Sequence, residues 1–114
     1  MKQFIKTMKA LSDPSRVKIL KMLQRRMMCV CEIQEALGIA QSTASNHLRI
    51  LEDAGLTTFE KDGLWVNYTL ANGRDNPYAQ AILANLSSWL EDDPDVSELI
   101  RRLPEIRRET ICRK

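Results

Sequence analysis

The sequence predicts a mainly α-helical fold with one small β-hairpin, an α+β arrangement, and three observations support this. Residues that favour helices, chiefly Leu, Ile, Ala, Lys, Arg and Glu, dominate the composition, whereas aromatic residues make up 5%. Apolar residues recur at helical spacing along most of the chain. Two short segments typical of β-strands flank an Asp-Gly pair, which is a strong hairpin signal. A chain of 114 residues has room for one compact core.

Two helices are expected in the N-terminal part. The first covers about residues 2–11, where apolar side chains form one stripe. Residues 12–14 combine a capping residue with a proline at the first helical turn, so a second helix begins there and runs to about Gln24. Two lysines of this second helix, Lys18 and Lys21, are expected to face the solvent.

Two further helices, joined by a tight turn, follow. The first covers residues 31–37 and ends at Gly38, because glycine readily adopts the left-handed conformation found at helix ends. The second opens at residues 41–43 and closes at Gly55. This pattern is typical of a helix-turn-helix, in which the second helix enters the major groove of DNA.

The rest of the chain supplies a hairpin and two more helices. The expected strands are residues 56–60 and 64–70, joined by residues 61–63. Residues 77–90 have strong helical spacing, and a last helix begins at Asp93-Pro94 and is ended or kinked by Pro104. A hairpin that follows a helix-turn-helix makes the predicted fold a winged helix-turn-helix.

The helix after Gly38 carries short polar and forked side chains on its outward face. Such groups suit base edges and phosphate oxygens, whereas a free surface helix would favour Lys and Glu. The expected partner is double-stranded DNA, and the candidate contacts are Gln41, Ser42, Thr43, Ser45, Asn46, His47 and Arg49, with Lys61 in the hairpin. His47 has a second interpretation as a hydrogen-bonding scaffold or phosphate contact, and as the sole histidine it cannot build a zinc site.

Charge is unevenly distributed along the chain. Residues 1–28 hold eight basic side chains against one acidic one, and residues 91–98 are acidic, although the net charge is only +2. Each charge alone is best explained as part of a solvated helix face. Their clustering nevertheless permits an electrostatic footprint for a polyanion.

Three segments carry a family resemblance: ALSDPSRVKILKML, CVCEIQEALGIAQSTASNHLRILEDAGL and the hairpin after them. Together, over about residues 5–90, they closely resemble the ArsR/SmtB family of metal-sensing repressors, most specifically in the S-x-x-S-x-H-L-x-x-L-x-x-A-G-L pattern from Ser42 to Leu56. The resemblance implies a homodimer that sits on operator DNA and releases it when an inducer binds.

The apolar stripes of the first helix and of residues 77–90 exceed what one core needs, which agrees with a dimer. The candidate interface residues are Phe4, Met8, Ile82, Leu86 and Trp89. Residues 1–92 are expected to form the DNA-binding and dimerisation domain, and residues 93–114 a C-terminal helical tail.

The cysteines indicate the inducer. In the arsenic- and antimony-responsive branch of the family, a C-V-C motif at this place binds the metalloid, and Cys29 and Cys31 match it. The resemblance therefore implies As(III) or Sb(III) as the inducer, and thiolates are soft ligands that select such ions. Gln34 stands where that branch often has a third cysteine, so Cys112 is a candidate third ligand.

Chelation by this motif has a structural requirement. Residues two apart on a helix point about 200° apart, so Cys29 and Cys31 need non-helical backbone at the helix start to share one ion. Binding would then distort this helix and misplace the recognition helix. The alternative is a purely structural role, in which both cysteines pack as small buried hydrophobic residues.

Several alternatives remain open. A redox-responsive repressor would oxidise Cys29 or Cys31, and a cadmium- or lead-responsive member would share C-V-C, although residues 1–28 contain no further cysteine. A protein-interaction module without DNA binding disagrees with the polar helix face. Zinc sensing is not expected because residues 77–90 contain no His, Asp or Glu, and catalysis is not expected because His47 has no evident nucleophile partner. The chain shows no signal peptide and no membrane span, so a cytoplasmic location is expected.

Overall fold

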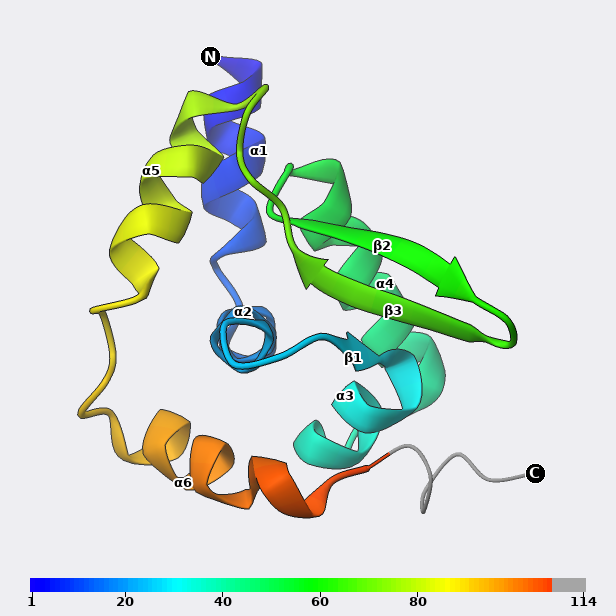
Figure 1. The fold of residues 1–114 in the computed structure, drawn as a ribbon. Helices are drawn as coiled ribbons and strands as arrows, with labels where there is room; N and C mark the ends of the chain where they lie inside the picture. Colours follow the sequence, from blue (N-terminus) through cyan, green and yellow to red (C-terminus); the bar gives the residue numbers. More distant parts are fainter. Residues whose placement is uncertain (108–114) are drawn as a thin grey trace.

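The computed structural model describes residues 1–107 as six α-helices, one short 3-10 helix and three strands (Figure 1). In chain order these are α1 (Lys2–Ala10), α2 (Pro14–Leu23), β1 (Met28–Cys29), α3 (Val30–Leu37), α4 (Gln41–Asp53), β2 (Thr57–Asp62), β3 (Trp65–Leu70), α5 (Pro77–Leu86), α6 (Pro94–Arg102) and η1 (Leu103–Glu105). The predicted winged helix-turn-helix is confirmed. Among the helices described, none is long and apolar enough to cross a membrane.

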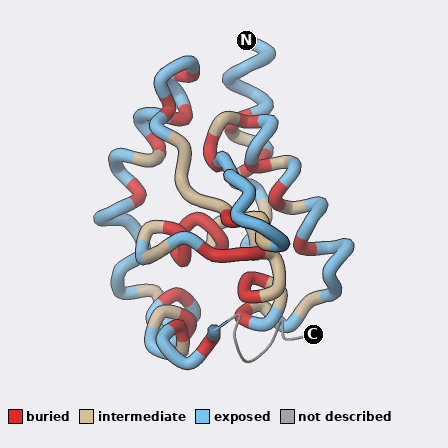
Figure 2. Tube along the Cα trace, turned by 45° about the vertical axis from the view of Figure 1, so that its right-hand side comes forward, coloured by how far each residue is buried: buried red, intermediate tan, exposed pale blue. Residues whose placement is uncertain are grey.

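The second helix, α2, lies at the centre of the molecule. Figure 1 shows it end-on, with α1 and α5 above it and α6 below. Asp13 caps this helix, because its side chain accepts a hydrogen bond of 2.8 Å from the backbone N–H of Ser15. The side chains of Ile19, Leu20 and Met22 are fully buried. Figure 2 shows that buried positions follow the inner sides of the helices around this centre.

Lys21 of α2 is buried, so its predicted solvent exposure is wrong. Only 2% of the residue is exposed, and its ammonium group donates hydrogen bonds of 2.8 Å to the carbonyl oxygens of Leu86 and Trp89. It also forms an ion pair with the carboxylate of Glu91. A buried ammonium group is tolerated because these partners satisfy its donors.

The sequence predicts that this helix continues to Leu90, but α5 ends at Leu86. Contacts around the Leu86 carbonyl accompany this early end. The Leu86 carbonyl, which a continuing helix would pair with the N–H of Leu90, instead accepts from the backbone N–H of Trp89 at 3.2 Å and from the ammonium group of Lys21 at 2.8 Å. Leu90 has a φ of 63°, a left-handed conformation that turns the chain away from the helix axis. Trp89 therefore lies in the turn after the helix.

The three strands form one antiparallel sheet in the order β1-β3-β2. The hairpin turns at Gly63 and Leu64, so β2 extends two residues further toward the tip than predicted, whereas β3 begins one residue later than predicted. Lys61 pairs with Val66 within the ladder. The sequence does not predict β1, which places Cys29 opposite Asn67 of β3. A strand of two residues is too short to show a periodic pattern.

The last helix belongs to the same core as the rest of the chain. Leu99 of α6, together with Leu103 and Ile106 around η1, is buried in the cluster that contains Leu20 and Ile33. Pro104 falls where α6 gives way to η1, as predicted. The division of the chain at residue 92 stays a prediction, but residues 94–106 pack as a structural layer beneath α2 and α3 (Figure 1).

Candidate nucleic-acid interface and cysteine site

The helix-turn-helix is formed by α3 and α4. Gly38 ends α3 with a φ of 66°, which confirms the predicted left-handed cap. Along α4, the side chains of Ala44, Leu48 and Leu51 are fully buried and hold the helix against the core. The opposite face of α4 is therefore fixed toward the solvent.

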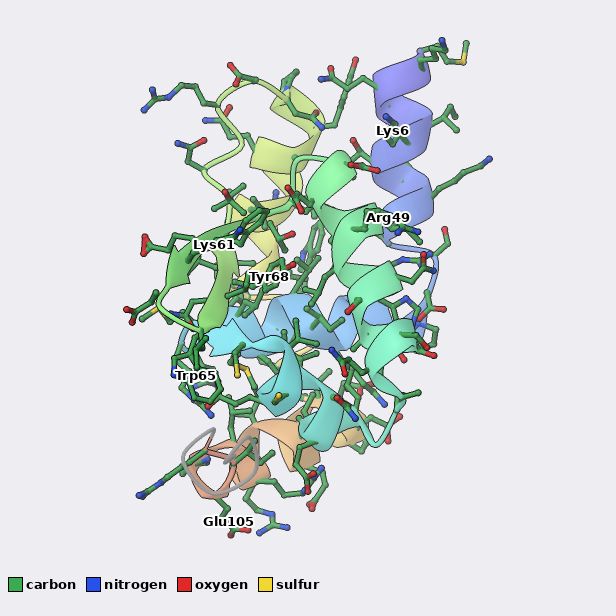
Figure 3. All side chains as sticks on the ribbon, turned by 90° about the vertical axis from the view of Figure 1, so that its right-hand side faces the viewer. Lys6, Arg49, Lys61, Trp65, Tyr68 and Glu105 are labelled. Atoms are coloured by element: carbon green, nitrogen blue, oxygen red, sulfur yellow. The ribbon has the colours of Figure 1, made fainter. Side chains whose placement is uncertain are left out.

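The outer face of α4, as we call it below, consists of exposed polar residues. These are Gln41, Ser42, Thr43, Ser45, Asn46 and Arg49. Within this set, the guanidinium of Arg49 donates a hydrogen bond of 2.5 Å to the side chain of Asn46. Figure 3 looks onto α4, with the hairpin and Lys61 on one side of it and Lys6 of α1 on the other. The predicted DNA contacts thus lie on one helix face and the neighbouring wing.

His47 is half-buried and differs from the residues around it. Its Nδ1 lies 3.2 Å from one guanidinium nitrogen of Arg16. The other two nitrogens of Arg16 donate to the carbonyl oxygens of Ala10 at 2.8 Å and Lys9 at 3.2 Å. A guanidinium has only donors, so Nδ1 is the acceptor in this contact. His47 therefore links α4 to α1 and α2, in agreement with its interpretation as a scaffold residue.

The two cysteines of the C-V-C motif occupy different backbone environments. Cys29 is the last residue of β1 and the N-cap of α3, with extended backbone (φ −87°, ψ 169°), and is 2% exposed. Cys31 lies in the first turn of α3 and is half-buried. The backbone at Cys29 is thus non-helical, which is the arrangement that chelation by residues two apart requires.

Glu32 completes a capping box at the start of α3. Its side chain accepts a hydrogen bond of 3.0 Å from the backbone N–H of Cys29, and the Cys29 side chain accepts from the backbone N–H of Glu32. This role of Glu32 was not among the predictions from the sequence. The signal was present as Cys29-x-x-Glu32, with cysteine in the place that Ser or Thr usually takes.

The environment of Cys29 favours the neutral thiol. Burial raises the pKa of Cys29 above its ordinary value, and the nearby carboxylate of Glu32 raises it further, against the lowering effect of the backbone hydrogen bond from Glu32. A metal or metalloid that binds this sulfur must therefore displace a tightly held proton.

The described part of the chain supplies no complete metal site. Within residues 1–107, no group of three or more His, Cys, Asp or Glu side chains is arranged to hold a metal ion. The candidate third ligand, Cys112, lies outside the described residues. Two thiols, those of Cys29 and Cys31, are what residues 1–107 bring to this place.

The predicted dimer residues fall into two groups. Phe4 and Trp89 are 39% and 49% exposed, and Met8 is half-buried. Ile82 and Leu86 are only 7% and 3% exposed, because α5 packs this stripe into the core of its own chain, so they are poorly placed as interface residues. An interface on this side of the molecule would be centred on the exposed parts of α1 and on the turn after α5.

Comparison with known proteins identifies the family. The pattern of the "Bacterial regulatory protein, arsR family" matches residues 13–58. The chain is 31% identical over 102 residues to the arsenical resistance operon repressor of Escherichia coli, covering 87% of this chain and 83% of the repressor. It is 41% identical over 66 residues to a cadmium resistance transcriptional regulatory protein CadC homolog of Staphylococcus aureus, covering 57% of this chain and about half (54%) of that protein.

Solved structures agree with these matches. The homodimeric winged helix-turn-helix DNA-binding domain of Mb0332 from Mycobacterium bovis, described as a possible ArsR-family transcriptional regulator, superimposes with a TM-score of 0.64 at 30% identity. The match covers 75% of this chain and 76% of that domain. The chain therefore belongs to the arsR family of bacterial regulatory proteins, which are DNA-binding transcriptional regulators and not enzymes.

Proposed function

We propose that this protein is a homodimeric repressor that binds operator DNA through α4 and the wing and releases it when As(III) or Sb(III) binds Cys29 and Cys31. Family membership supplies the coarser statement, a DNA-binding repressor whose inducers are metal or metalloid ions. The observation that carries the finer proposal is the position of the two thiols, one on extended backbone at the N-cap of α3 and the other in its first turn.

The donor set favours a soft, thiophilic ion. Thiolates select As(III), Sb(III) and similar ions over hard cations, and the described residues add no cluster of carboxylates or imidazoles that would favour zinc. Two local thiolates form a chelate, and Cys112, from the same chain or the partner subunit, is either a third ligand or an idle thiol. Cadmium or lead is the alternative within this class, but residues 1–28 offer no cysteine for it.

The route to DNA release runs through α3. This helix packs directly against α4 and is joined to it by the turn at Gly38. Drawing the sulfurs of Cys29 and Cys31 onto one ion displaces the cap of α3, and a shift of α3 moves α4 out of register with the major groove. DNA release then follows from the difference in inducer affinity between the two arrangements.

The redox alternative is less well supported by the structure. Sensing by oxidation requires a thiol with a lowered pKa, whereas burial raises the pKa of Cys29. An interaction module without DNA binding is also disfavoured, because the outer face of α4 is exposed and polar in a chain of a DNA-binding family. A repressor of this kind acts in the cytoplasm, where bacterial DNA lies.

Cysteine variants test the inducer site. Cys29→Ser and Cys31→Ser should each fold and bind the operator, because neither side chain lies on the outer face of α4, and each should lose release by arsenite. Cys112→Ser is the matched control: normal release means that Cys112 is not a ligand, and a need for more arsenite means that it is. Titration of reduced protein on fluorescent operator DNA measures all three. An intact arsenite response in the Cys29→Ser/Cys31→Ser variant would exclude the site, and a response of the wild type to peroxide alone would establish the redox reading.

The dimer is tested separately. Light scattering at micromolar concentration should show a dimer, and Trp89→Glu should weaken it by placing a charge on an exposed aromatic side chain at the proposed interface. Asn85→Glu, on the solvent side of α5, is a suitable charge control. A monomer that binds a palindromic operator with full affinity would contradict the proposal.

A further inference from the structure

The cap of α3 is connected to the opposite end of the chain by one arginine. Arg26 lies between α2 and β1, and one of its terminal nitrogens donates a bond of 3.1 Å to the Glu32 carboxylate. Glu32 itself is 5% exposed and uses its other carboxylate oxygen to hold the N–H of Cys29 at 3.0 Å. The carboxylate end of the ion pair is thus removed from water, whereas the Arg26 side chain is 36% exposed, and the pair is directly continuous with the capping box.

The second terminal nitrogen of Arg26 reaches the C-terminal layer. It donates a bond of 2.6 Å to the carbonyl oxygen of Ile106 and a longer one of 3.4 Å to that of Leu103. Both residues have buried side chains, so these carbonyls are held in place by the core. A guanidinium suits this task because its planar fork presents donors in fixed directions to two different acceptors.

The other end of α3 is also attached to this layer. Arg102, the last residue of α6, donates from both terminal nitrogens to the carbonyl oxygen of Ala36, at 3.4 Å each. Figure 1 shows α6 and η1 directly below α3. The cysteine-bearing helix α3 is therefore linked to the C-terminal layer at both ends. At its start the link runs from Glu32 through Arg26, with a hydrogen bond of 2.6 Å to Ile106. Near its end the link is the pair of 3.4 Å hydrogen bonds from Arg102 to Ala36.

We propose that Arg26, Glu32 and the carbonyl groups of Leu103 and Ile106 form a latch that holds α3 in its DNA-binding arrangement, with Arg26 and Glu32 as positioning residues. The inference rests on the proposed function in taking Cys29 as an inducer ligand. It goes beyond that function by giving α6 and η1 a part in the response. The C-terminal layer is then a regulatory element and not an appended tail.

The latch opposes the inducer for a geometric reason. In the capping box the Cys29 sulfur accepts from the backbone of Glu32 while the Cys29 N–H is held by the Glu32 carboxylate. An ion shared with Cys31 must take the sulfur out of this arrangement, which loosens Glu32 and, through it, Arg26. Because DNA and the inducer favour different arrangements of α3, a weaker latch should raise the affinity for the inducer and lower the affinity for DNA.

Two substitutions break the latch at different points. Arg26→Gln removes the fork that joins Glu32 to Ile106. Glu32→Gln keeps an amide oxygen for the N–H of Cys29 but removes the charge that attracts Arg26, so it remains informative if the first variant folds poorly. The matched control is Arg101→Gln, which breaks the exposed Arg101–Glu98 pair on the same C-terminal helix without touching α3.

The first readout is independent of arsenic. In a Cys31→Ser/Cys112→Ser background, the rate at which an aromatic disulfide reagent modifies Cys29 reports how often the cap opens. We expect this rate to rise about fivefold or more in both latch variants and to stay unchanged in the control. In the three-cysteine chain, operator affinity should fall and the half-saturating arsenite concentration should decrease.

The outcomes separate the two proposals. Unchanged Cys29 reactivity in both latch variants, with native circular dichroism, would overturn the latch. A raised reactivity and weakened DNA binding in a chain that ignores arsenite would support the latch and reject the metalloid as inducer. Equal effects of Arg101→Gln would show general loosening of α6 and would also overturn the latch.

Discussion

The basic residues of α2 and of the segment just after it differ from the outer face of α4. The former bind groups inside the chain, whereas the latter are exposed to solvent. Arg16, Lys21 and Arg26 come from the basic N-terminal segment, yet each binds at least two partners inside the chain. The outer face of α4 carries little charge, and its side chains are exposed to solvent. The segment with more charge thus serves the scaffold, and the segment with less charge is open to a ligand.

A count of basic residues therefore overestimates the electrostatic footprint that this chain offers to DNA. Three of the eight basic side chains in residues 1–28 are hydrogen-bonded to carbonyl, carboxylate or imidazole groups of the same chain, and Arg25 lies 4.0 Å from the Glu91 carboxylate. A buried or paired cation stabilises the fold, whereas a cation in solvent is available to DNA phosphates. Variants of the two regions should therefore change different properties, one the stability of the fold and the other the affinity for DNA.

The largest effect is expected on the outer face of α4. Ser45→Ala and Arg49→Ala should each weaken operator binding by about 1–3 kcal/mol through lost base or phosphate contacts. The free energy of unfolding should change by less than about 0.5 kcal/mol, because both side chains are exposed. Fluorescence anisotropy over a range of salt concentrations measures operator affinity, and urea denaturation measures the free energy of unfolding.

A matched control is available on α6, where Ser97 and Arg101 are also exposed. Ser97→Ala/Arg101→Ala should leave DNA affinity unchanged. Full operator affinity in the Ser45→Ala/Arg49→Ala variant would mean that α4 is not the recognition helix of this chain.

The next largest effect is expected at Lys21 and should concern stability. Lys21→Met keeps an unbranched side chain but removes the ammonium donor from the carbonyl oxygens of Leu86 and Trp89 and from the Glu91 carboxylate, at a cost of about 1–3 kcal/mol in the free energy of unfolding. DNA affinity of the folded protein should change little. Lys18→Met, on the same helix but half-exposed, should be nearly neutral. Equal stability of the two variants would remove the distinction between inner and outer cations.

Lys21 also shows where prediction from sequence stops. Helical periodicity gave the helices, Gly38 gave the turn of the helix-turn-helix, and Asp-Gly gave the wing, because these signals are local. The burial of Lys21 depends on carbonyl groups more than sixty residues away, with sequence separations of 65 and 68. No local pattern distinguishes it from a solvated lysine.

At the cysteine site, too, the local features were predictable from the sequence and the long-range contacts were not. The C-V-C motif identified the two thiols, and the need for non-helical backbone was a local argument that agrees with the N-cap position of Cys29. The connection from Glu32 through Arg26 to Ile106 was not predictable, since it joins residues separated by 80 positions. The C-x-x-E spacing would have revealed only the capping box.

A smaller effect is expected at Arg16, which belongs to both sides of the comparison. It caps the end of α1 and also contacts His47 on α4. Arg16→Gln should weaken DNA binding less than Arg49→Ala does, because it acts only by letting His47 and α4 shift. In a double-mutant cycle with His47→Asn, the two changes should be non-additive by at least about 0.5 kcal/mol in DNA affinity. Strict additivity would show that the contact does not position α4.

The smallest effect is expected from the acid side of the Lys21 contact, and it should appear as a pH dependence. The hydrogen bond from Lys21 holds the pKa of the Glu91 carboxyl below its ordinary value. A carboxyl with a lowered pKa in the folded state stabilises the fold above its unfolded-state pKa, and this stabilisation is lost as the pH falls through the folded-state value. The melting temperature should therefore fall as the pH is lowered from about 6 to 3, and Glu91→Gln should reduce this fall.

Glu98 provides the comparison for this prediction, since Arg101 also lowers its pKa, but both partners of that pair are exposed. Salt screens exposed charges strongly, with a screening length of about 3 Å at 1 M, and screens a buried partner less. The partner of Glu91 is Lys21, whose side chain is 2% exposed, so the decline due to Glu91 should persist in high salt while that due to Glu98 disappears. If high salt removes both contributions equally, the burial of Lys21 does not protect its ion pair, and the contrast between inner and outer charges fails at this position.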